Sequence, residues 1–473
     1  MNLIKNKQLF FDDSKLFGRE NVVRKYGKPE IAAIYSDGIC STDFNTGNVF
    51  RLDNGKYRML YFAHSKEFDG KKLFCAESSD GINFAPEKLC LHGKKYEHEI
   101  MDLPQGSEVG TIYEDNTCEK SEKYKMLLAR CADPLSVIDE VYTSPDLINW
   151  TIKKDVSWGD GTEPLVSVFY NDVYKCHTVI ERPFWGIRTV GFKETADWQS
   201  FTDYRYCLRA DSEDEPLSEI YGMYSFAYDG MYIGIPHIYR NLKSELNAKY
   251  KNGIIDTQLA YSYDGRYWQR SLRKPFISGF SDDGCGVPRP LVWVASALKK
   301  GDEVLLYAAT SKKEHGPAFC DPEDSGEMLV YRLRTDGFIY LETQNKNEKS
   351  VVSTREKAWH SGELSINIEA KNATVAVYDS CENEDVEGMN VLGIAKKIAG
   401  FTHDDCIPFS GDSTEWVPQF KNGRKIDELS GKTLVFEICF TDGKIYSISG
   451  NCTDLFNTEG ARYRKFGILP KSK

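Results

Sequence analysis

The sequence predicts an all-β protein in which one strand-and-turn unit occurs five times before a second β domain begins. Three observations predict this fold class: a repeated turn phrase, strand-like segments of alternating apolar and polar residues, and a high content of aromatic residues. The chain has 27 Tyr and 25 Phe among 473 residues, and aromatic residues favour strands. Self-similarity at a spacing of tens of residues indicates a repeat architecture.

The repeated phrase is an Asp followed four residues later by an aromatic residue, as in YSYDGRYW at 261–268. The other copies are ESSDGINF at 77–84, YTSPDLINW at 142–150, KETADWQSF at 193–201 and YRLRTDGFIY at 331–340. The five pairs are Asp80/Phe84, Asp146/Trp150, Asp197/Phe201, Asp264/Trp268 and Asp336/Tyr340. We expect each Asp to bond backbone amides of its own turn and each aromatic residue to pack between sheets. The phrase therefore predicts a structural corner and not a catalytic motif.

Two strand-like segments precede each corner and are joined by a turn signal such as Asp229-Gly230. The first segments are 46–52, 109–114, 164–170, 222–228 and 290–296, and the second are 55–65, 122–131, 172–181, 230–239 and 302–311. Three to four antiparallel strands repeated five times predict a five-bladed β-propeller over residues 1–341. Residues 1–35 carry no copy of the unit, and closing the ring is one role open to them.

The pattern changes after Leu341. Residues 342–359 are polar and predict a linker. Alternating segments at 363–370, 373–380, 400–409 and 432–450 then predict a C-terminal β-sandwich over residues 360–473.

The bulk composition restricts the partners and the compartment. A net charge of −11 without a basic run argues against nucleic acid. No apolar stretch approaches 18 residues and the first 30 residues lack an apolar signal region, so we expect a cytoplasmic protein without a membrane contact. Thirteen dispersed Cys then predict reduced thiols. Because zinc, EF-hand and nucleotide-binding motifs are missing, we expect neither metal nor cofactor.

Acidic residues lie near the beginning of several first strands, where a propeller places its ligand site. Ten residues before the first turn stand Asp43 in the first unit and Glu219 in the fourth. Glu108 lies near the same place in the second unit, and Asp160 and Glu163 in the third. Acids converging on one site predict glycoside chemistry, in which one carboxyl group donates a proton and another stays ionised. A third acid nearby raises the pKa of the donor. The alternative for each acid is a solvated or turn-capping side chain.

Three further segments carry candidate binding residues. Arg182, Trp185 and Arg188 fall in one short connection, and Arg with Trp suits recognition of a sugar ring and its hydroxyls. An ordinary salt bridge at a blade edge is the alternative for these arginines. Arg289 precedes the last first strand, and His237 is either a ligand contact or a core histidine.

Five units with acids at one end, followed by a sandwich, resemble the glycoside hydrolases of families 32, 43, 68 and 117. The phrases QLFFDDSKLF, EIYGMYSFAYDGMYIG and GFTHDDCIPFSGDS are most similar to a bacterial family-32-like group with a C-terminal β-sandwich. The resemblance implies an Asp43 nucleophile or base, a Glu219 general acid and a Glu163 that stabilises or sets the donor's pKa. Asp160 is the alternative to Glu163 in this match. From the residues themselves we expect Arg182 and Trp185 to hold the sugar, with further binding residues at Glu108, Asp160, His237 and Arg289.

The leading hypothesis is a glycosidase that acts on a short furanoside-containing oligosaccharide, fructosyl first and arabinosyl second. A phosphorylase of similar fold is an alternative, because Arg182, Arg188 and Arg289 could form a basic cluster for phosphate. A non-catalytic sugar-binding propeller is the third reading. A homo-oligomer is compatible with all three.

Overall fold

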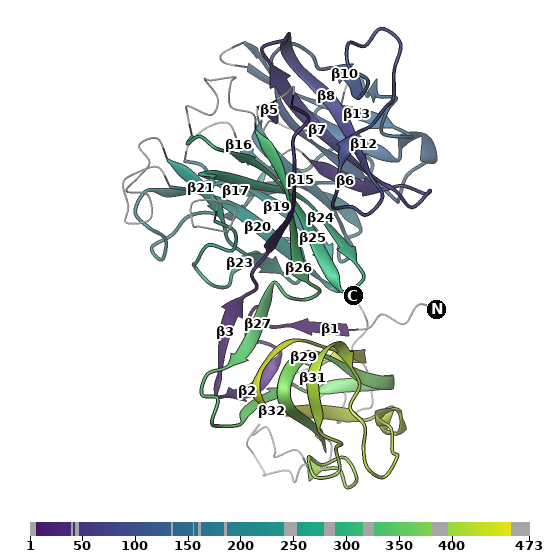
Figure 1. The fold of residues 1–473 in the computed structure, drawn as a ribbon, viewed down its shortest axis with the longest axis vertical. Coiled ribbons are helices and arrows are strands. Elements are labelled where there is room, and N and C mark those ends of the chain that lie inside the picture. Colours follow the sequence, from purple (N-terminus) through teal and green to yellow (C-terminus); the bar gives the residue numbers. More distant parts are fainter. Residues whose placement is uncertain are drawn as a thin grey trace. The chain divides into compact units, whose positions relative to one another are not determined.

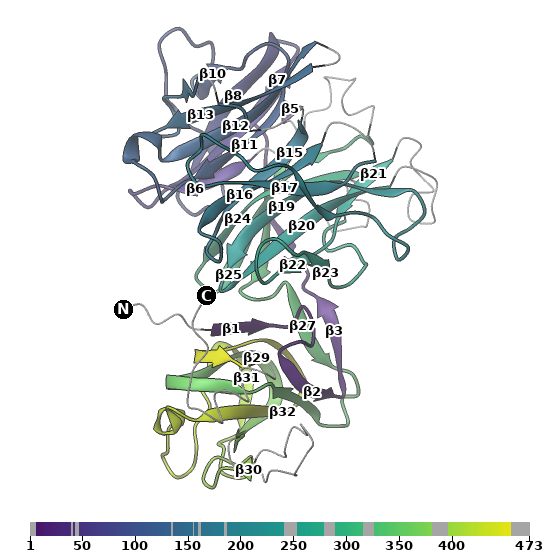
Figure 2. The same ribbon diagram turned by 180° about the vertical axis from the view of Figure 1, so that it is seen from behind.

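The computed structural model describes residues 6–38, 41–42, 47–133, 136–154, 156–158, 162–183, 187–240, 253–278, 289–315, 326–380 and 396–455. In these ranges the chain is nearly all β-structure, with two short 3-10 helices, η1 (Lys120–Glu122) and η2 (Ile426–Leu429) (Figure 1, Figure 2). The chain divides into two compact units, one of residues 28–333 and one of residues 1–27 with 334–473.

Three separate antiparallel sheets follow one another in the unit of residues 28–333. The first contains β5 (Ser41–Thr42), β6 (Asn48–Arg51), β7 (Tyr57–Ser65), β8 (Phe68–Ser78), β9 (Ala85–Pro86) and β10 (Glu99–Asp102). The second contains β11 (Ser107–Glu114), β12 (Tyr124–Asp133), β13 (Ser136–Ser144) and β14 (Thr151–Ile152). The third contains β15 (Thr162–Asn171), β16 (Cys176–Pro183), β17 (Val190–Thr195) and β18 (Arg205–Leu208). Each sheet is built from consecutive strands, as short turns between antiparallel strands require.

The next two groups of strands are joined in one nine-stranded sheet. The fourth group contains β19 (Ser218–Tyr228), β20 (Met231–Arg240), β21 (Ile254–Thr257), β22 (Ala260–Ser262) and β23 (Gln269–Arg270). The fifth contains β24 (Leu291–Lys300), β25 (Glu303–Ser311), β26 (Glu327–Arg334) and β4 (Glu30–Tyr35). The two groups meet where β21 and β24 pair at Ile255 and Leu291. The outermost strand of the fifth group thus comes from the N-terminal part of the chain.

Five apolar clusters pack these five groups against one another in a closed cycle. Alternate side chains of one strand serve opposite faces: in β7, Met59 and Tyr61 pack against the fifth group, whereas Leu60 and Phe62 pack against the second. Further clusters join the second group to the third, the third to the fourth, and the fourth to the fifth. Because both faces of these strands are buried, the strands contain apolar runs in place of the strict alternation of apolar and polar residues that was expected.

The corner phrase forms the same turn in four of its five copies. In the first copy, Asp80 Oδ1 accepts the backbone N–H groups of Ile82 and Asn83 at 2.8 Å each, and the Ser78 hydroxyl donates to it. Asp146, Asp197 and Asp264 bond the amides two and three residues ahead in the same way. The residue after each Asp has a positive φ, from 56° to 75°. The predicted corner is therefore confirmed as a local backbone device at these four positions.

The second unit is built on one curled nine-stranded sheet. Its strands are β1 (Asn6–Leu9), β2 (Leu16–Glu20), β3 (Val22–Tyr26), β27 (Ile339–Thr343), β28 (Ser350–Thr354), β29 (Lys357–Asp379), β30 (Lys396–Lys397), β31 (Phe409–Trp416) and β32 (Thr433–Asp454). The long strands β29 and β32 pair along most of their length, from Trp359 opposite Cys452 to Tyr378 opposite Val435. Lys357 lies opposite both ends of β32, at Leu434 and Asp454, so the sheet bends back on itself.

The boundaries of the units differ from the predicted ones at three places. Strands β1, β2 and β3 pair with β32, β28 and β27 of the second unit, although residues 1–341 were expected to form one propeller domain. The fifth corner belongs to the second unit too, because Asp336 bonds Lys7 and Ser447 there. The expected linker of residues 342–359 contains β28, which pairs with β32. Buried Ser350, Val352 and Thr354 alternate with the partly exposed Val351 and Ser353. Because two of the buried residues are polar, the strand resembles a linker in composition.

Candidate functional site

Glu219 lies at the beginning of β19, next to the connection between β16 and β17. Its carboxyl group accepts a hydrogen bond from Arg188 Nη1 at 2.7 Å. The chain holds the two residues together at backbone level as well, since Ile220 N donates to the Arg188 carbonyl at 3.2 Å. Both side chains are partly exposed, at 18% for Glu219 and 32% for Arg188. A ligand can therefore reach this ion pair.

Two buried tyrosines lie beneath the ion pair. Tyr221 of β19 and Tyr239 of β20 meet edge to face, with ring centroids 5.7 Å apart. The Arg188 guanidinium lies 5.2 Å and 5.1 Å from their centroids. Arg182, at the end of β16, lies 4.3 Å from the Tyr221 ring and is almost fully buried. Cations over tyrosine faces are attracted by the ring quadrupole, so these rings fix both guanidinium groups.

His315 completes the cluster from the segment after β25. Its Nε2 lies 3.0 Å from the Tyr221 hydroxyl, and its ring packs on Tyr239 at 4.6 Å. Burial, together with the charges of Arg188 and Arg182, lowers the pKa of His315 to about 4. Burial also lowers the pKa of Arg182 to about 10, so this guanidinium stays charged at neutral pH. The cluster thus joins one carboxyl group, two cations and a neutral imidazole.

The other predicted acids are placed only in part. Asp43, Asp160 and Trp185 lie outside the described residues. Glu163 is described by its backbone alone, which places it in β15 directly opposite Arg182 in β16. The register therefore brings the Glu163 position to the strand that carries Arg182, next to the Glu219 cluster.

Three predicted binding residues have structural partners of their own. Glu108 is half-exposed and lies 3.9 Å from Lys71. Arg289 is buried and contacts Glu327 through Nε and Nη2 at 3.1 Å and 3.0 Å. His237 is fully buried in β20, and burial lowers its pKa to about 3 despite a contact with the Val294 backbone. These positions show no contact with Glu219 or Arg188 among the described residues.

Sequence reasoning did not select Tyr221, Tyr239 or His315. Tyr221 and Tyr239 lie in segments that were selected for other residues. The antiparallel pairing of β19 with β20 is the signal that could have brought the two tyrosines together. His315 lies 96 residues after Glu219 and follows a strand of a different group, so no spacing rule connects them.

A buried acid in the first sheet region was also missed. Asp37 Oδ2 accepts the Tyr61 hydroxyl at 2.8 Å, and His98 Nε2 lies 3.3 Å from the same oxygen. Tyr35 and Tyr61 share a hydrogen bond of 3.0 Å. Burial, with the nearby Tyr35 and Asp37, raises the pKa of Tyr61 well above its ordinary value. Asp37 is thus one of several buried carboxyl groups in this unit, and it lies six residues before Asp43.

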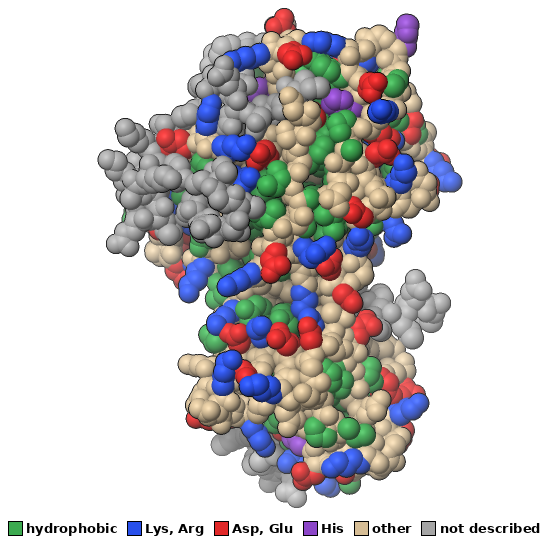
Figure 3. All heavy atoms as spheres, viewed as in Figure 1, with side chains coloured by type: hydrophobic (Ala, Val, Ile, Leu, Met, Phe, Trp, Pro, Cys, Tyr) green, Lys and Arg blue, Asp and Glu red, His purple; other side chains and the backbone are tan. Residues whose placement is uncertain are grey.

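Charged side chains of both signs are interspersed over the face seen in Figure 3. The net charge of −11 is therefore not gathered into one patch on this face. Within the described part of the chain, no helix has the length and apolar character needed to cross a bilayer.

No protein-family model and no curated protein matches the chain, whereas solved structures resemble it at low identity. A glycosyl hydrolase from Bacteroides ovatus is 16% identical, with 65% of this chain and 94% of that chain covered at a TM-score of 0.43. The β-1,2-mannobiose phosphorylase from Listeria innocua is 13% identical, with 62% and 90% covered at 0.45. A structure described under the GH130 family of mannoside phosphorylases is 15% identical, with 65% and 94% covered at 0.43. At these scores, function has to be inferred from the residues of the chain.

Proposed function

We propose that this protein is a carbohydrate-active enzyme that cleaves a glycosidic bond of a short oligosaccharide at the Glu219 cluster. The observation that carries the proposal is the partly exposed Arg188–Glu219 pair, 2.7 Å apart and fixed over buried aromatic rings. A positioned carboxyl group can transfer a proton, and a guanidinium can bind neighbouring hydroxyls. Rigid support from buried residues is what such a site needs.

The closed cycle of five packed groups supports a five-bladed β-propeller for residues 28–333. The curled sheet of β29 and β32 supports a sandwich-like second unit. In a propeller the inner strands of the blades surround the central axis. When these strands all run in the same direction, they all begin at the same end of the axis. The proposal therefore places Asp43 and Glu163 at the same mouth as Glu219.

In the proposed mechanism Glu219 protonates the oxygen of the leaving sugar. Asp43 attacks the anomeric carbon or activates a water, and Glu163 stabilises the developing positive charge. Arg188 orients the Glu219 carboxyl group in the free enzyme. When Glu219 carries the proton to be donated, the guanidinium is free to bind a hydroxyl of the substrate. Arg182 is buried beneath Tyr221 and acts as a positioning residue for the ring.

A fructosyl furanoside is the first substrate we propose and an arabinosyl furanoside the second, both on the resemblance of the sequence phrases. A specific observation favours phosphorolysis as a second candidate reaction. Arg188 is partly exposed and lies over the Tyr221 ring, beside the neutral His315. One guanidinium can bind two phosphate oxygens at once, so inorganic phosphate could replace water as the attacking group.

The test is an incubation of the full chain with fructo-, arabino-, xylo- and manno-oligosaccharides, with and without inorganic phosphate. Released sugars and sugar phosphates are separated by chromatography. We expect Glu219→Gln to lower turnover about 10²- to 10⁴-fold, the usual contribution of a general acid. Glu303→Gln is the matched control, because Glu303 pairs with Arg332 at 2.8 Å at the beginning of β25, whereas His315 of the cluster follows the end of that strand.

Phosphate-independent release that is lost in Glu219→Gln supports the hydrolase. Release that requires phosphate and yields a sugar phosphate supports the phosphorylase. If folded protein releases nothing from any substrate, or if both variants behave alike, the catalytic proposal is wrong. A non-catalytic sugar-binding protein is then the remaining reading of the cluster.

A further inference from the structure

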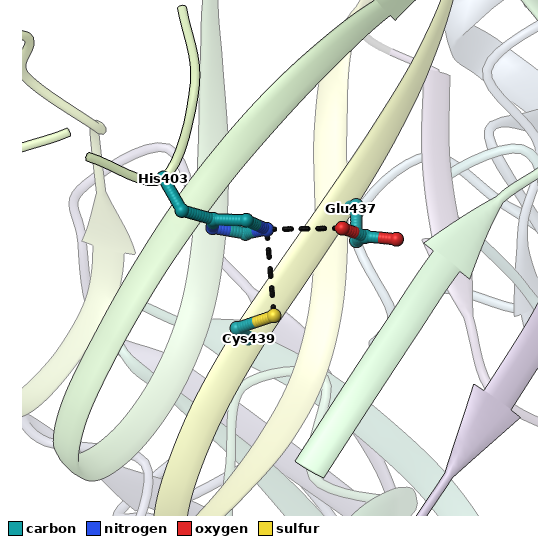
Figure 4. Close-up of side chains that lie close together, drawn as sticks. All are labelled: His403, Glu437 and Cys439. Atoms are coloured by element: carbon teal, nitrogen blue, oxygen red, sulfur yellow. Dashed lines mark hydrogen bonds and ion pairs between the residues drawn. The ribbon is translucent and has the colours of Figure 1, made fainter. Parts of the chain in front are cut away.

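Three metal-binding side-chain types meet in the second unit. Glu437 and Cys439 lie two residues apart in β32, so their side chains leave the same face of the strand. His403, from the turn that follows β30, points at both of them (Figure 4). Its Nε2 lies 3.1 Å from Glu437 Oε1 and 3.4 Å from Cys439 Sγ. All three ligand atoms fall within 4.8 Å of one another.

The two separations from His403 Nε2 fit the ligands of one tetrahedral ion. Zinc bonds nitrogen and oxygen at about 2.0 Å and sulfur at about 2.3 Å, which places tetrahedral ligand atoms about 3.3 Å (N to O) and about 3.5 Å (N to S) apart. The observed 3.1 Å and 3.4 Å are close to these values. The side chains of His403 and Glu437 are 24% and 28% exposed, so an ion can enter from solvent.

The surroundings orient these ligands. His403 Nδ1 lies 2.9 Å from the Thr374 hydroxyl, and the Tyr378 hydroxyl donates to Glu437 Oε1 at 2.8 Å. A hydrogen bond at Nδ1 directs the Nε2 lone pair to the metal, and such partners of ligands raise affinity. The turn itself is preformed, because Asp405 Oδ2 accepts the Thr402 hydroxyl and backbone N–H.

We propose that His403, Glu437 and Cys439 form a site for a divalent ion of the zinc class, with the fourth position open to solvent. A thiolate and a carboxylate neutralise the two positive charges, and a nitrogen, oxygen and sulfur set selects zinc or cobalt over magnesium and calcium. The bound ion ties the turn at His403 to β32. This site is independent of the Glu219 cluster and of the proposed reaction.

The competing state is a plain ion pair between His403 and Glu437. Burial lowers the pKa of His403, but its hydrogen bonds to Cys439 and Glu437 outweigh this effect and raise it to about 9. A protonated imidazole satisfies the same distances without a metal. Direct measurement of metal binding separates the two states.

The experiment titrates chelator-treated full-length protein with Zn²⁺ by calorimetry and with Co²⁺ by absorption. We expect one equivalent of either ion, with a thiolate-to-cobalt charge-transfer band. Cys439→Ser removes the band and the equivalent. Cys452→Ser is the matched control, since Cys452 is a buried free thiol of the same strand, and it retains both. Thr374→Val weakens binding about 10- to 100-fold by removing the partner of Nδ1.

Circular dichroism checks the fold of each variant. The absence of a saturable equivalent in the unaltered chain overturns the proposal, as does binding that survives Cys439→Ser, because the other cysteines then hold the ion. If Cys439→Ser does not fold, Thr374→Val decides, and unchanged affinity in that variant overturns the proposal. Zn²⁺ should also raise the melting temperature of the unaltered chain by mass action and leave that of Cys439→Ser unchanged.

Discussion

Arg240 and Asp256 form a buried ion pair next to the site-bearing strands. Arg240 Nε lies 2.9 Å from Asp256 Oδ2, and the two side chains are 5% and 0% exposed. Burial raises the pKa of Asp256, and the guanidinium of Arg240 counteracts this effect. Glu215 approaches Arg240 at 3.3 Å as a second acid. The cation is thus what keeps Asp256 ionised at neutral pH.

We predict that Arg240→Met lowers the free energy of unfolding by about 3–5 kcal/mol at neutral pH, because it leaves a buried charge without its partner. The folded-state pKa of Asp256, already raised to about 6, then rises further above its unfolded value. Stability is therefore retained at pH below the unfolded pKa and is lost as pH rises towards the folded one. Urea unfolding at pH 4.5 and pH 8 measures the effect.

The double variant Arg240→Met/Asp256→Asn is the control, and we expect it to recover most of the loss at pH 8. A loss in Arg240→Met that is the same at both pH values would contradict the assignment. It would mean that packing of the arginine stem, and not the charge on Asp256, dominates.

At the scale of single residues the sequence selected Glu219 and Arg188 separately but did not predict the contact between them. The shared offset from a turn selected Glu219 because equivalent strands begin at equivalent places. Arg188 was selected because it lies in the same short connection as Trp185 and Arg182. The contact of His315 with Tyr221 and that of His403 with Cys439 depend on which strands become neighbours in space. No local pattern of charge or hydrophobicity carries that information.

At the scale of the element, the corner turn explains why Asp is the repeated residue. Partial burial raises the pKa of Asp80, but the backbone N–H groups of Asn83 and Ile82, with the Asn83 and Ser78 side chains, outweigh it and hold the pKa well below its usual range. Gly81 follows with a φ of 73°, whereas Leu147 takes the same position in the second corner with a φ of 69°. Local hydrogen bonding thus maintains a backbone conformation that L-residues rarely adopt.

We predict that Asp80→Ala lowers the free energy of unfolding by about 1–3 kcal/mol at pH 7, the range for hydrogen bonds to a charged group. The pKa is depressed in the folded state, so this contribution is present above the unfolded pKa of about 3.9 and is lost as pH falls below it. Urea unfolding from pH 7 to pH 3 should show the two proteins converging. Asp172→Asn is the control, since Asp172 is exposed and pairs only weakly with Lys175 at 3.7 Å. A deficit that persists unchanged at pH 3 would show that the carboxylate is not the cause.

Strands were predicted well where a strand pattern repeats along the sequence. They were predicted poorly where a polar composition hid the strand pattern. The first and second strands of the units appear as β6 and β7, β11 and β12, β15 and β16, β19 and β20, and β24 and β25. Both faces of these strands are packed, so they contain long apolar segments that stand out in the sequence. Strand β28 resembles a linker in sequence because this short strand has few apolar residues. Its pairing with β32 joins segments that are far apart in the sequence, so no local pattern predicts it.

At the scale of the whole molecule, the N-terminal β4 completes the last group of strands of its unit. Leu329 and Val330 of β26 lie opposite Ile34 and Ala33 of β4. Tyr35 joins the apolar cluster that connects the first group to the fifth. From the sequence, ring closure was only one possible role of residues 1–35. No local pattern shows that a strand there pairs with a strand almost 300 residues away. Pairing of this kind contributes to stability only after the intervening groups have formed.

We predict that proline substitutions at Ala33 and Ile34 have unequal effects. Adjacent residues of an edge strand direct their N–H groups alternately to the neighbour and to solvent, and proline removes one N–H group. One of the two variants should therefore lose a hydrogen bond to β26 and be less stable than the other by about 1–3 kcal/mol. Urea unfolding measures this difference. Hydrogen exchange in peptides covering residues 30–35 and 327–334 should rise in the less stable variant, with the neighbouring substitution as its control. Equal stabilities and equal exchange in the two variants would mean that β4 does not close the cycle through β26.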